Sequence, residues 1–445
     1  MSILFAVASV ALVLWVVYLL YRRSDIGLIC LLAGQVFYIA FGPNAAVLGG
    51  LHIGPLDAVA FVLMFAGALR TLRSFRTLDL NRVIIFGYLA IFAISLARGI
   101  AAHGLTAAGN ESRAFVGPLA GVLYFATAPV DVASVRRYTQ IYLCFGFVLC
   151  MVAVASAAGL PVGMIAWNSA AIGALDGRYL PATGAAALAV CGFLSLAMLH
   201  YRRSGLIAKL LPVIFVGFAI YLRHRTVWMM LLAGMAALLF VDFRLFRRII
   251  PFALVAAAAV ALLAVYGSKE HVAIGEEQFF DSMSNGNTFM WRLNGWEALL
   301  LDDEQNALTV TIGKSVGSGF WRVDPTTYGT IEVAPHSEYV ENYLRVGVVG
   351  AALILLFALR PLKRLWSFSK AGGEWVYPSA SVWAIVVLMT LVYGFTYGND
   401  PHLYALLGIA NALAAGPAME ETDAVEGSEY DWTMQGIADA SGEPA

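Results

Sequence analysis

One histidine, His336, is the candidate general base in this sequence. His336 follows Pro335, and proline is common in the first turn of a helix, so we expect His336 at a helix N-terminus. The positive end of a helix disfavours an imidazolium, which keeps the ring neutral and able to accept a proton. Backbone amides at the same end favour a nearby anion. Glu338 and Glu341 follow closely and could orient the ring or a substrate, although Glu341 could simply pair with Arg345, which has helical i,i+4 spacing from it. The alternative is that a lone histidine near a membrane boundary is structural.

Two arginines in a short turn supply positive charge. Arg223 and Arg225 flank His224 between two apolar runs. Because Arg225 opens the second run, we expect its guanidinium to point into a helix bundle at the membrane boundary. A guanidinium binds phosphate in planar, bidentate geometry, which suits a pyrophosphate. The alternative for this turn is that both side chains extend toward lipid headgroups.

A further arginine, Arg292, lies in a segment that we predict to be a helix on the membrane surface. Asn287 or Thr288 provides an N-cap, and the aromatic and leucine residues that follow supply an apolar face. Arg292 could bind an anionic substrate there. It could equally pair with Glu297 or with a headgroup.

Metal chemistry has less support in the sequence. The acidic run 302–304 could bind a divalent cation, but it is also typical of a solvated helix end, which we favour. Asp400 and His402 form a second candidate site of unknown role. The HExxH and CxxC spacings of zinc sites are absent. We therefore expect no metal and no cofactor.

Membrane helices must position these side chains. Of the 445 residues, 60% are hydrophobic and 13% charged, against about half and about a quarter in soluble proteins. Long apolar runs satisfy their backbone groups in lipid as helices, so we predict an all-α polytopic membrane protein with about 12–13 transmembrane helices. The net charge of −1 gives no reason to expect a nucleic acid partner. The expected spans are 3–21, 26–41, 56–69, 83–97, 115–128, 138–158, 181–199, 208–222, 226–241, 249–266, 340–359, 376–396 and 403–416.

The basic residues predict how the chain is oriented and divided. Most Lys and Arg lie in alternate short loops, which places those loops in the cytoplasm. Transmembrane helices then occupy 1–266 and 341–418, surrounded by membrane lipids, and the polar loop 267–340 faces outward with the candidate site. The acidic segment 419–445 contains no Lys or Arg, and we expect a disordered cytoplasmic tail there.

The sequence around His336 resembles a family signature. The run Pro335–Tyr339 ahead of Gly347–Gly350 resembles the signature of the O-antigen ligase and polysaccharide polymerase superfamily. Ser337 and Pro181–Thr183 depart from it, because many members have Asn there, and the acidic tail is not a family mark. Other family landmarks occur in the expected order, namely Gly177-Arg178 before a span, Arg225-Thr226 at a helix start, Trp291-Arg292 with Trp296, and the glycine-rich turn 312–320.

This resemblance implies a GT-C-like fold and a metal-independent, inverting glycosyltransferase in a bacterial inner membrane, with its site facing the periplasm. The implied donor is a glycan linked to undecaprenyl pyrophosphate. Carried over by position, His336 would activate the acceptor hydroxyl, with Glu338 and Glu341 in support. The implied pyrophosphate-binding residues are Arg225 and Arg292, with Arg178, Arg223 and Arg113 as further candidates.

Several functions stay open on the sequence alone. We favour a polymerase that joins lipid-linked repeat units of an exopolysaccharide or O-antigen, with a chain-length regulator as a further partner. A ligase that moves a finished glycan to lipid A-core uses the same donor, as does a protein O-oligosaccharyltransferase. A lipid-glycan transporter would need charged residues deep in the spans, whereas the charges here lie almost entirely at span ends. A non-catalytic assembly subunit, docked through the acidic tail, is the remaining alternative.

Overall fold

The structure, a computed structural model, is mostly helical. It describes residues 2–42, 46–48, 50–73, 80–167, 178–200, 206–251, 287–301, 306–323, 329–370 and 380–415. Of these residues, 83% are helical, which confirms the predicted all-α class. The expected span 249–266 lies largely outside the described residues, as do the acidic run 302–304 and the tail 419–445.

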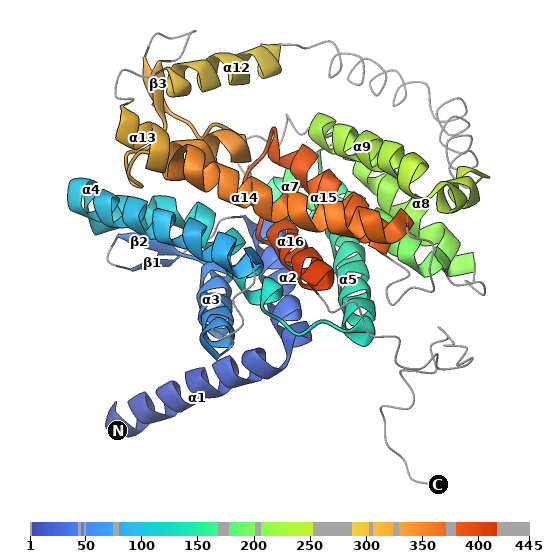
Figure 1. The fold of residues 1–445 in the computed structure, drawn as a ribbon, viewed down its shortest axis with the longest axis horizontal. Coiled ribbons are helices and arrows are strands. Elements are labelled where there is room, and N and C mark those ends of the chain that lie inside the picture. Colours follow the sequence, from blue (N-terminus) through green and yellow to red (C-terminus); the bar gives the residue numbers. More distant parts are fainter. Residues whose placement is uncertain are drawn as a thin grey trace.

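Six helices among the described residues are long and apolar enough to cross a membrane, so the chain is a polytopic membrane protein. These spans fall in α2 (Ser24–Phe41), α3 (Pro55–Arg73), α4 (Leu80–Ala126), α5 (Val132–Ala157), α7 (Ala182–Leu196) with its 3-10 extension Ala197–His200, and α14 (Glu338–Lys370). Shorter apolar helices are α8 (Leu206–Tyr221), α9 (Arg225–Val241), α15 (Ala380–Gly394) and α16 (Pro401–Ala415). The N-terminal α1 (Ser2–Arg22) projects away from the other helices (Figure 1).

The core of the bundle is built around α16, whose side chains are almost all buried. A helix that is apolar on all sides is stable only when it is covered all round. Helix α4 packs closely along it, and a Cβ at Gly121 would lie 3.0 Å from both the Ala405 nitrogen and the Pro401 oxygen. This close approach fixes the loop before α16, which borders two of the cavities described below.

Helix α4 agrees with the predicted spans in part. The ranges 83–97 and 115–128 were expected as two spans joined by an outer loop, and they lie in two helical segments on either side of a break at Gly104. The difference is that the residues between the two spans are helical and do not form a loop. At φ +83° Gly104 has a backbone conformation that other residues rarely adopt. Arg98 and Arg113 therefore both lie on helix rather than in a loop.

A layer of short elements covers one end of the bundle, on the side away from α1 (Figure 1). It contains α12 (Asn287–Leu300), α13 (Ala307–Ile312) and an antiparallel hairpin of β3 (Trp321–Val323) and β4 (Thr330–Glu332), in which Arg322 pairs with Ile331. A second antiparallel hairpin, β1 (Ala46–Leu48) with β2 (Leu51–Ile53), lies beside α4. The described part of the range 267–340 thus contains two short helices, α12 and α13, and a hairpin that was not predicted.

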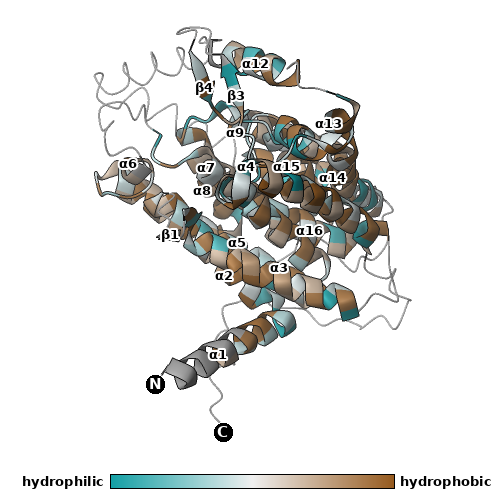
Figure 2. Ribbon diagram, turned by 90° about the vertical axis from the view of Figure 1, so that its left-hand side faces the viewer, coloured by the Kyte–Doolittle hydropathy of each residue, from teal (hydrophilic) through white to brown (hydrophobic). Residues whose placement is uncertain are grey.

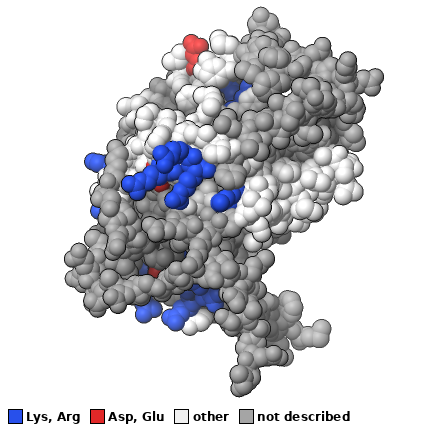
Figure 3. Space-filling model, turned by 90° about the vertical axis from the view of Figure 1, so that its right-hand side faces the viewer, with Lys and Arg blue, Asp and Glu red and all other residues white. Residues whose placement is uncertain are grey.

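Polar side chains follow this division of the molecule. Hydrophilic colours gather on α12 and β3, while α2, α3 and α5 are mainly hydrophobic (Figure 2). The face shown in Figure 3 carries patches of Lys and Arg with few acidic side chains beside them, and the largest patch lies near the middle of the view, below the short-element layer. The hydrophilic residues of α12 and β3 make the short-element layer more polar than the helices below it.

The covering layer meets α14 at a break in that helix. Gly347 has φ +65°, and a Cβ there would collide with the carbonyl group of Thr311. Gly313, at φ +85°, is held as closely against the Arg345 backbone. Both positions require glycine, because a side chain would push α13 away from α14. This contact fixes the polar N-terminal turns of α14 against the layer above.

Candidate functional site

Three arginines from separate elements line one cavity of about 810 Å³. They are Arg178 in the segment before α7, Arg225 at the start of α9 and Arg292 on α12. Apolar and aromatic side chains form much of the remaining wall, including Met229, Phe289, Leu391, Val392 and Phe395. The structure thus brings together three residues that are far apart in the sequence. We call this space the arginine cavity.

His224 holds two of these elements together. Its side chain is buried at the N-cap of α9, and its Nε2 lies 2.9 Å from the Leu180 carbonyl, so Nε2 donates to that oxygen. Burial lowers the pKa of His224 to about 4; the hydrogen bond opposes this shift and the charge of Arg178 adds to it. The ring is therefore neutral. It joins the start of α9 to the segment before α7, which places Arg225 and Arg178 on the same cavity.

Arg292 is oriented by the loop that follows α15. One guanidinium nitrogen donates to the Thr396 carbonyl at 3.1 Å, and the group lies 5.1 Å from the centre of the Tyr397 ring. No ion pair joins Arg292 to Glu297 in the described part of the chain, so the structure does not support a simple pair on α12. The positive charge faces a neutral carbonyl and an aromatic ring at the edge of the arginine cavity.

His336 lies just outside the helix that was predicted to contain it. Helix α14 begins at Glu338, and His336 has φ +52° in the preceding turn, so it is not in the first helical turn. Its side chain is exposed. Partial desolvation, then Arg292 and then Arg322 lower the pKa of His336. Desolvation and these two arginines thus favour the neutral ring, in place of the helix amides that the sequence suggested.

Hydrogen bonds on both sides fix the turn that carries His336. Trp296 of α12 donates from its indole nitrogen to the Pro335 carbonyl at 2.6 Å. The Glu338 amide donates to the Tyr397 carbonyl at 2.9 Å. Tyr397 is also the residue whose ring lies beside Arg292. His336 does not line the arginine cavity itself, but it is attached through these contacts to two of the elements that do.

The two acidic candidates support the loop rather than the histidine. The Tyr404 hydroxyl donates to the Glu338 carboxylate, and the Asn399 amide donates to Glu341 at 3.0 Å. Both carboxylates are thus directed at the loop 395–400 and α16. The sequence also suggested that Glu341 could pair with Arg345. That interpretation was wrong, because Arg345 forms its ion pair with Glu111 of α4.

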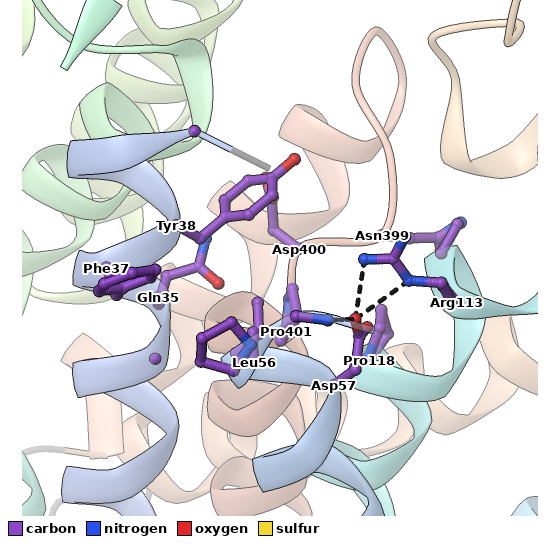
Figure 4. Close-up of a pocket in the computed structure, with 15 residues that line it drawn as sticks. Gln35, Phe37, Tyr38, Leu56, Asp57, Arg113, Pro118, Asn399, Asp400 and Pro401 are labelled. Carbon is purple, nitrogen blue, oxygen red and sulfur yellow. Dashed lines mark hydrogen bonds and ion pairs between the residues drawn. The ribbon is translucent and has the colours of Figure 1, made fainter. Parts of the chain in front are cut away.

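The other two arginine candidates lie away from the arginine cavity. Arg113 pairs with Asp57 at 2.7 Å in a separate cavity of about 300 Å³ (Figure 4). Arg223 lies in the turn before α9 with φ +57° and does not line the cavity. The Arg113 partner is 56 positions away in the sequence, so the pair could not be recognised from local spacing.

Sequence reasoning missed part of the site. The loop after α15 contributes Phe395, Thr396 and Tyr397 to the cavity. The sequence feature that could have identified this loop is a short run of aromatic and polar residues between two apolar segments. Arg322 on β3 was also unassigned. It is buried, lies 4.2 Å from the centre of the Trp291 ring, and packs where a Cβ at Gly295 would collide with it.

Within the described residues, no group of three or more His, Cys, Asp or Glu side chains could hold a metal ion. Cys30, Cys144, Cys150 and Cys191 are free thiols. Comparison of the chain with protein-family models gives no match, and no curated protein matches it. The functional argument therefore depends on the geometry of the site and on the sequence pattern around it.

Proposed function

We propose that the protein is a membrane glycosyltransferase that polymerises repeat units carried on undecaprenyl pyrophosphate, acting at the periplasmic face of a bacterial inner membrane. The observation that carries this proposal is the convergence of Arg178, Arg225 and Arg292 on one cavity with an apolar wall. A lipid pyrophosphate needs both features, because its phosphates require cationic hydrogen-bond donors and its chain requires apolar contact.

In this proposal the arginines stabilise the leaving group. The acceptor hydroxyl oxygen forms a bond to the anomeric carbon of the donor sugar while the bond from that carbon to the pyrophosphate oxygen breaks. Negative charge then moves onto the pyrophosphate, where preorganised guanidinium groups stabilise it. Attack from the face opposite the leaving group inverts the anomeric centre.

His336 takes the proton that the acceptor hydroxyl loses. A general base must be unprotonated at working pH, and the lowered pKa of His336 favours that state. Its exposure leaves room for a glycan acceptor to approach. The short-element layer and the loop 395–400 hold the base and the phosphate-binding groups in fixed relation.

Complementation of a deletion strain tests the proposal. We expect Arg225→Gln and Arg292→Gln each to lower polymer synthesis about 10²–10³-fold, the usual effect of removing one such electrostatic donor. We expect His336→Ala to lower it about 10²–10⁴-fold. Arg73→Gln is the matched control, because Arg73 is exposed on α3 and contacts Tyr21. Normal polymer from the three site variants, at equal protein levels, would refute the proposal.

The glycans of the deletion strain separate a polymerase from a ligase. Loss of a polymerase leaves single repeat units on the lipid carrier. Loss of a ligase leaves long chains on that carrier, unattached to lipid A-core. We expect single repeat units, and long lipid-linked chains would replace the polymerase assignment with the ligase one.

A further inference from the structure

A third cavity, of about 450 Å³, lies beside the first half of α4. Its described lining residues include four basic side chains and no carboxylate. Two aromatic side chains and several hydroxyl groups complete the wall. We call it the basic cavity; the residues that matter here are Arg98, His103, Lys314, Phe320, Trp321 and Arg345.

The basic cavity has a rigid frame. The Val316 amide donates to the Ser95 carbonyl at 3.3 Å, and the Ser95 hydroxyl donates to the Lys314 carbonyl at 2.9 Å. The Lys314 amide donates to the Leu344 carbonyl at 2.7 Å. A Cβ at Gly99 would collide with the Val316 carbonyl, so only glycine allows this contact. The segment that carries Lys314 is therefore fixed to both α4 and α14.

One guanidinium in the wall of this cavity, that of Arg98, forms no ion pair with a carboxylate of the described residues. Arg345 is paired with Glu111 and also donates to Ser318 and to the Gly319 carbonyl. Arg98 donates to the Gly313 carbonyl at 3.0 Å, which is a neutral acceptor, and within the described residues it has no carboxylate partner. An anion in this cavity would find a guanidinium that is already held in place.

The basic cavity is linked to His336 by α12. Arg292 on this helix lines the arginine cavity and Leu299 lines the basic cavity. The two residues are seven positions apart, or about 10 Å along a helix. Trp296 lies between them in the sequence and holds the turn before His336 through Pro335. Both cavities thus border the helix that holds the candidate base in place.

Trp321 adds a feature suited to a sugar. It is 55% exposed at the edge of the cavity, where the indole offers a flat apolar face. Ser315 and Ser318 place hydroxyl groups in the same wall. A few polar groups placed beside aromatic ones are the usual make-up of a small-molecule site. Together with Arg98 and Lys314, these groups match a sugar ring that bears a negative charge.

We propose that the basic cavity binds an anionic sugar residue of the acceptor glycan, such as a uronic acid, and so selects acidic repeat units. This inference rests on the proposed function for its biological meaning. Its physical content is a binding site for acidic saccharides that is separate from the site for lipid pyrophosphate.

Binding measurements on the full-length protein in nanodiscs test the inference. The probes are a short oligoglucuronate, a neutral gluco-oligosaccharide of equal length, and inorganic pyrophosphate. We expect Arg98→Gln and Lys314→Gln each to weaken oligoglucuronate binding about tenfold, as for the loss of one charge-assisted hydrogen bond. The neutral probe should bind at least about tenfold more weakly to the wild type by the same reasoning.

Control variants separate this site from the proposed catalytic one. Arg82 lies on α4, 16 positions from Arg98, and Arg82→Gln should leave all binding unchanged. Arg225→Gln should weaken pyrophosphate binding and leave oligoglucuronate binding unchanged. If oligoglucuronate binding is lost in Arg98→Gln while pyrophosphate binding does not depend on Arg225, the inference holds and the proposed function fails.

Three results would overturn the inference. Oligoglucuronate binding that is unchanged in both Arg98→Gln and Lys314→Gln would remove the site. Equal binding of the neutral probe would remove its selectivity for charge. Competition in which pyrophosphate displaces oligoglucuronate from the wild type and Arg98→Gln abolishes binding of both would make it a phosphate site and not a sugar site.

Discussion

At the scale of single residues, the protonation of His336 decides whether the proposed reaction can run. Arg292 and Arg322 both lower the pKa of His336, after the larger effect of partial desolvation. A lowered pKa means that the ring loses its proton below the usual 6.5. The base therefore stays active under mildly acidic conditions in which a free imidazole would be protonated.

The pH dependence of transfer follows from this shift. Because the neutral ring is the active form, the rate should fall as pH is lowered through the pKa of His336, at a pH below 6.5. Rates of transfer by the reconstituted protein, measured across pH with saturating donor, check this. If the rate already falls at or above pH 6.5, on the acid limb of the pH–rate profile, a group other than His336 limits the reaction.

Substitution of Arg322 should shift the pH of this acid limb without changing a residue that lines the arginine cavity. Arg322→Gln removes one of the two positive charges that lower the pKa of His336, so the limb should move to higher pH. Arg322→Lys keeps the charge and is the matched control, with a limb close to that of the wild type. The same pH–rate measurement applies. An unchanged limb in Arg322→Gln would mean that this charge does not help to set the pKa.

At the scale of elements, glycines set the contact between the covering layer and α14. Gly347→Ala should destabilise the protein by two effects. The backbone at φ +65° costs an alanine about 1–3 kcal/mol. The collision with Thr311 should add about 1–3 kcal/mol, as overpacking does. Thermal unfolding in detergent measures both together.

Gly104→Ala is the control that separates the two effects. Gly104 has φ +83°, but a Cβ there would meet nothing within 4 Å. This variant should show the backbone cost alone. Equal losses of stability in Gly104→Ala and Gly347→Ala would contradict the tight contact between α13 and α14.

The elements also show what could be predicted from the sequence. Apolar runs predicted most of the helix ranges, and Arg225 was correctly placed at the start of α9. The helical residues on either side of Gly104 were not predicted, because residues 98–114 are too polar to be recognised as part of a span but still contain many helix-forming residues. The resemblance of separate motifs grouped Arg178, Arg225 and Arg292 as candidates, and the structure places all three on one cavity. The contribution of Thr396 and Tyr397, from the loop after α15, depends on tertiary packing that no local sequence pattern encodes.

At the scale of the whole molecule, the orientation in the membrane is the remaining prediction. Basic loops predict that the short-element layer faces the periplasm. In a variant with the four native cysteines replaced by alanine, Leu308→Cys at an exposed position of α13 should react in intact cells with a maleimide that cannot cross the membrane. Ser367→Cys, exposed near the end of α14, should react only after the cells are lysed. The reverse pattern would place the site in the cytoplasm.

The central claim is that the arginine cavity and His336 form one reaction centre. Single-turnover transfer by the purified protein in vesicles, with undecaprenyl-pyrophosphate oligosaccharide as donor, tests it most directly. We predict that His336→Ala binds the donor normally and transfers it about 10²–10⁴-fold more slowly. We predict that Arg225→Gln with Arg292→Gln lowers both binding and transfer. Transfer at the wild-type rate by His336→Ala would contradict the claim.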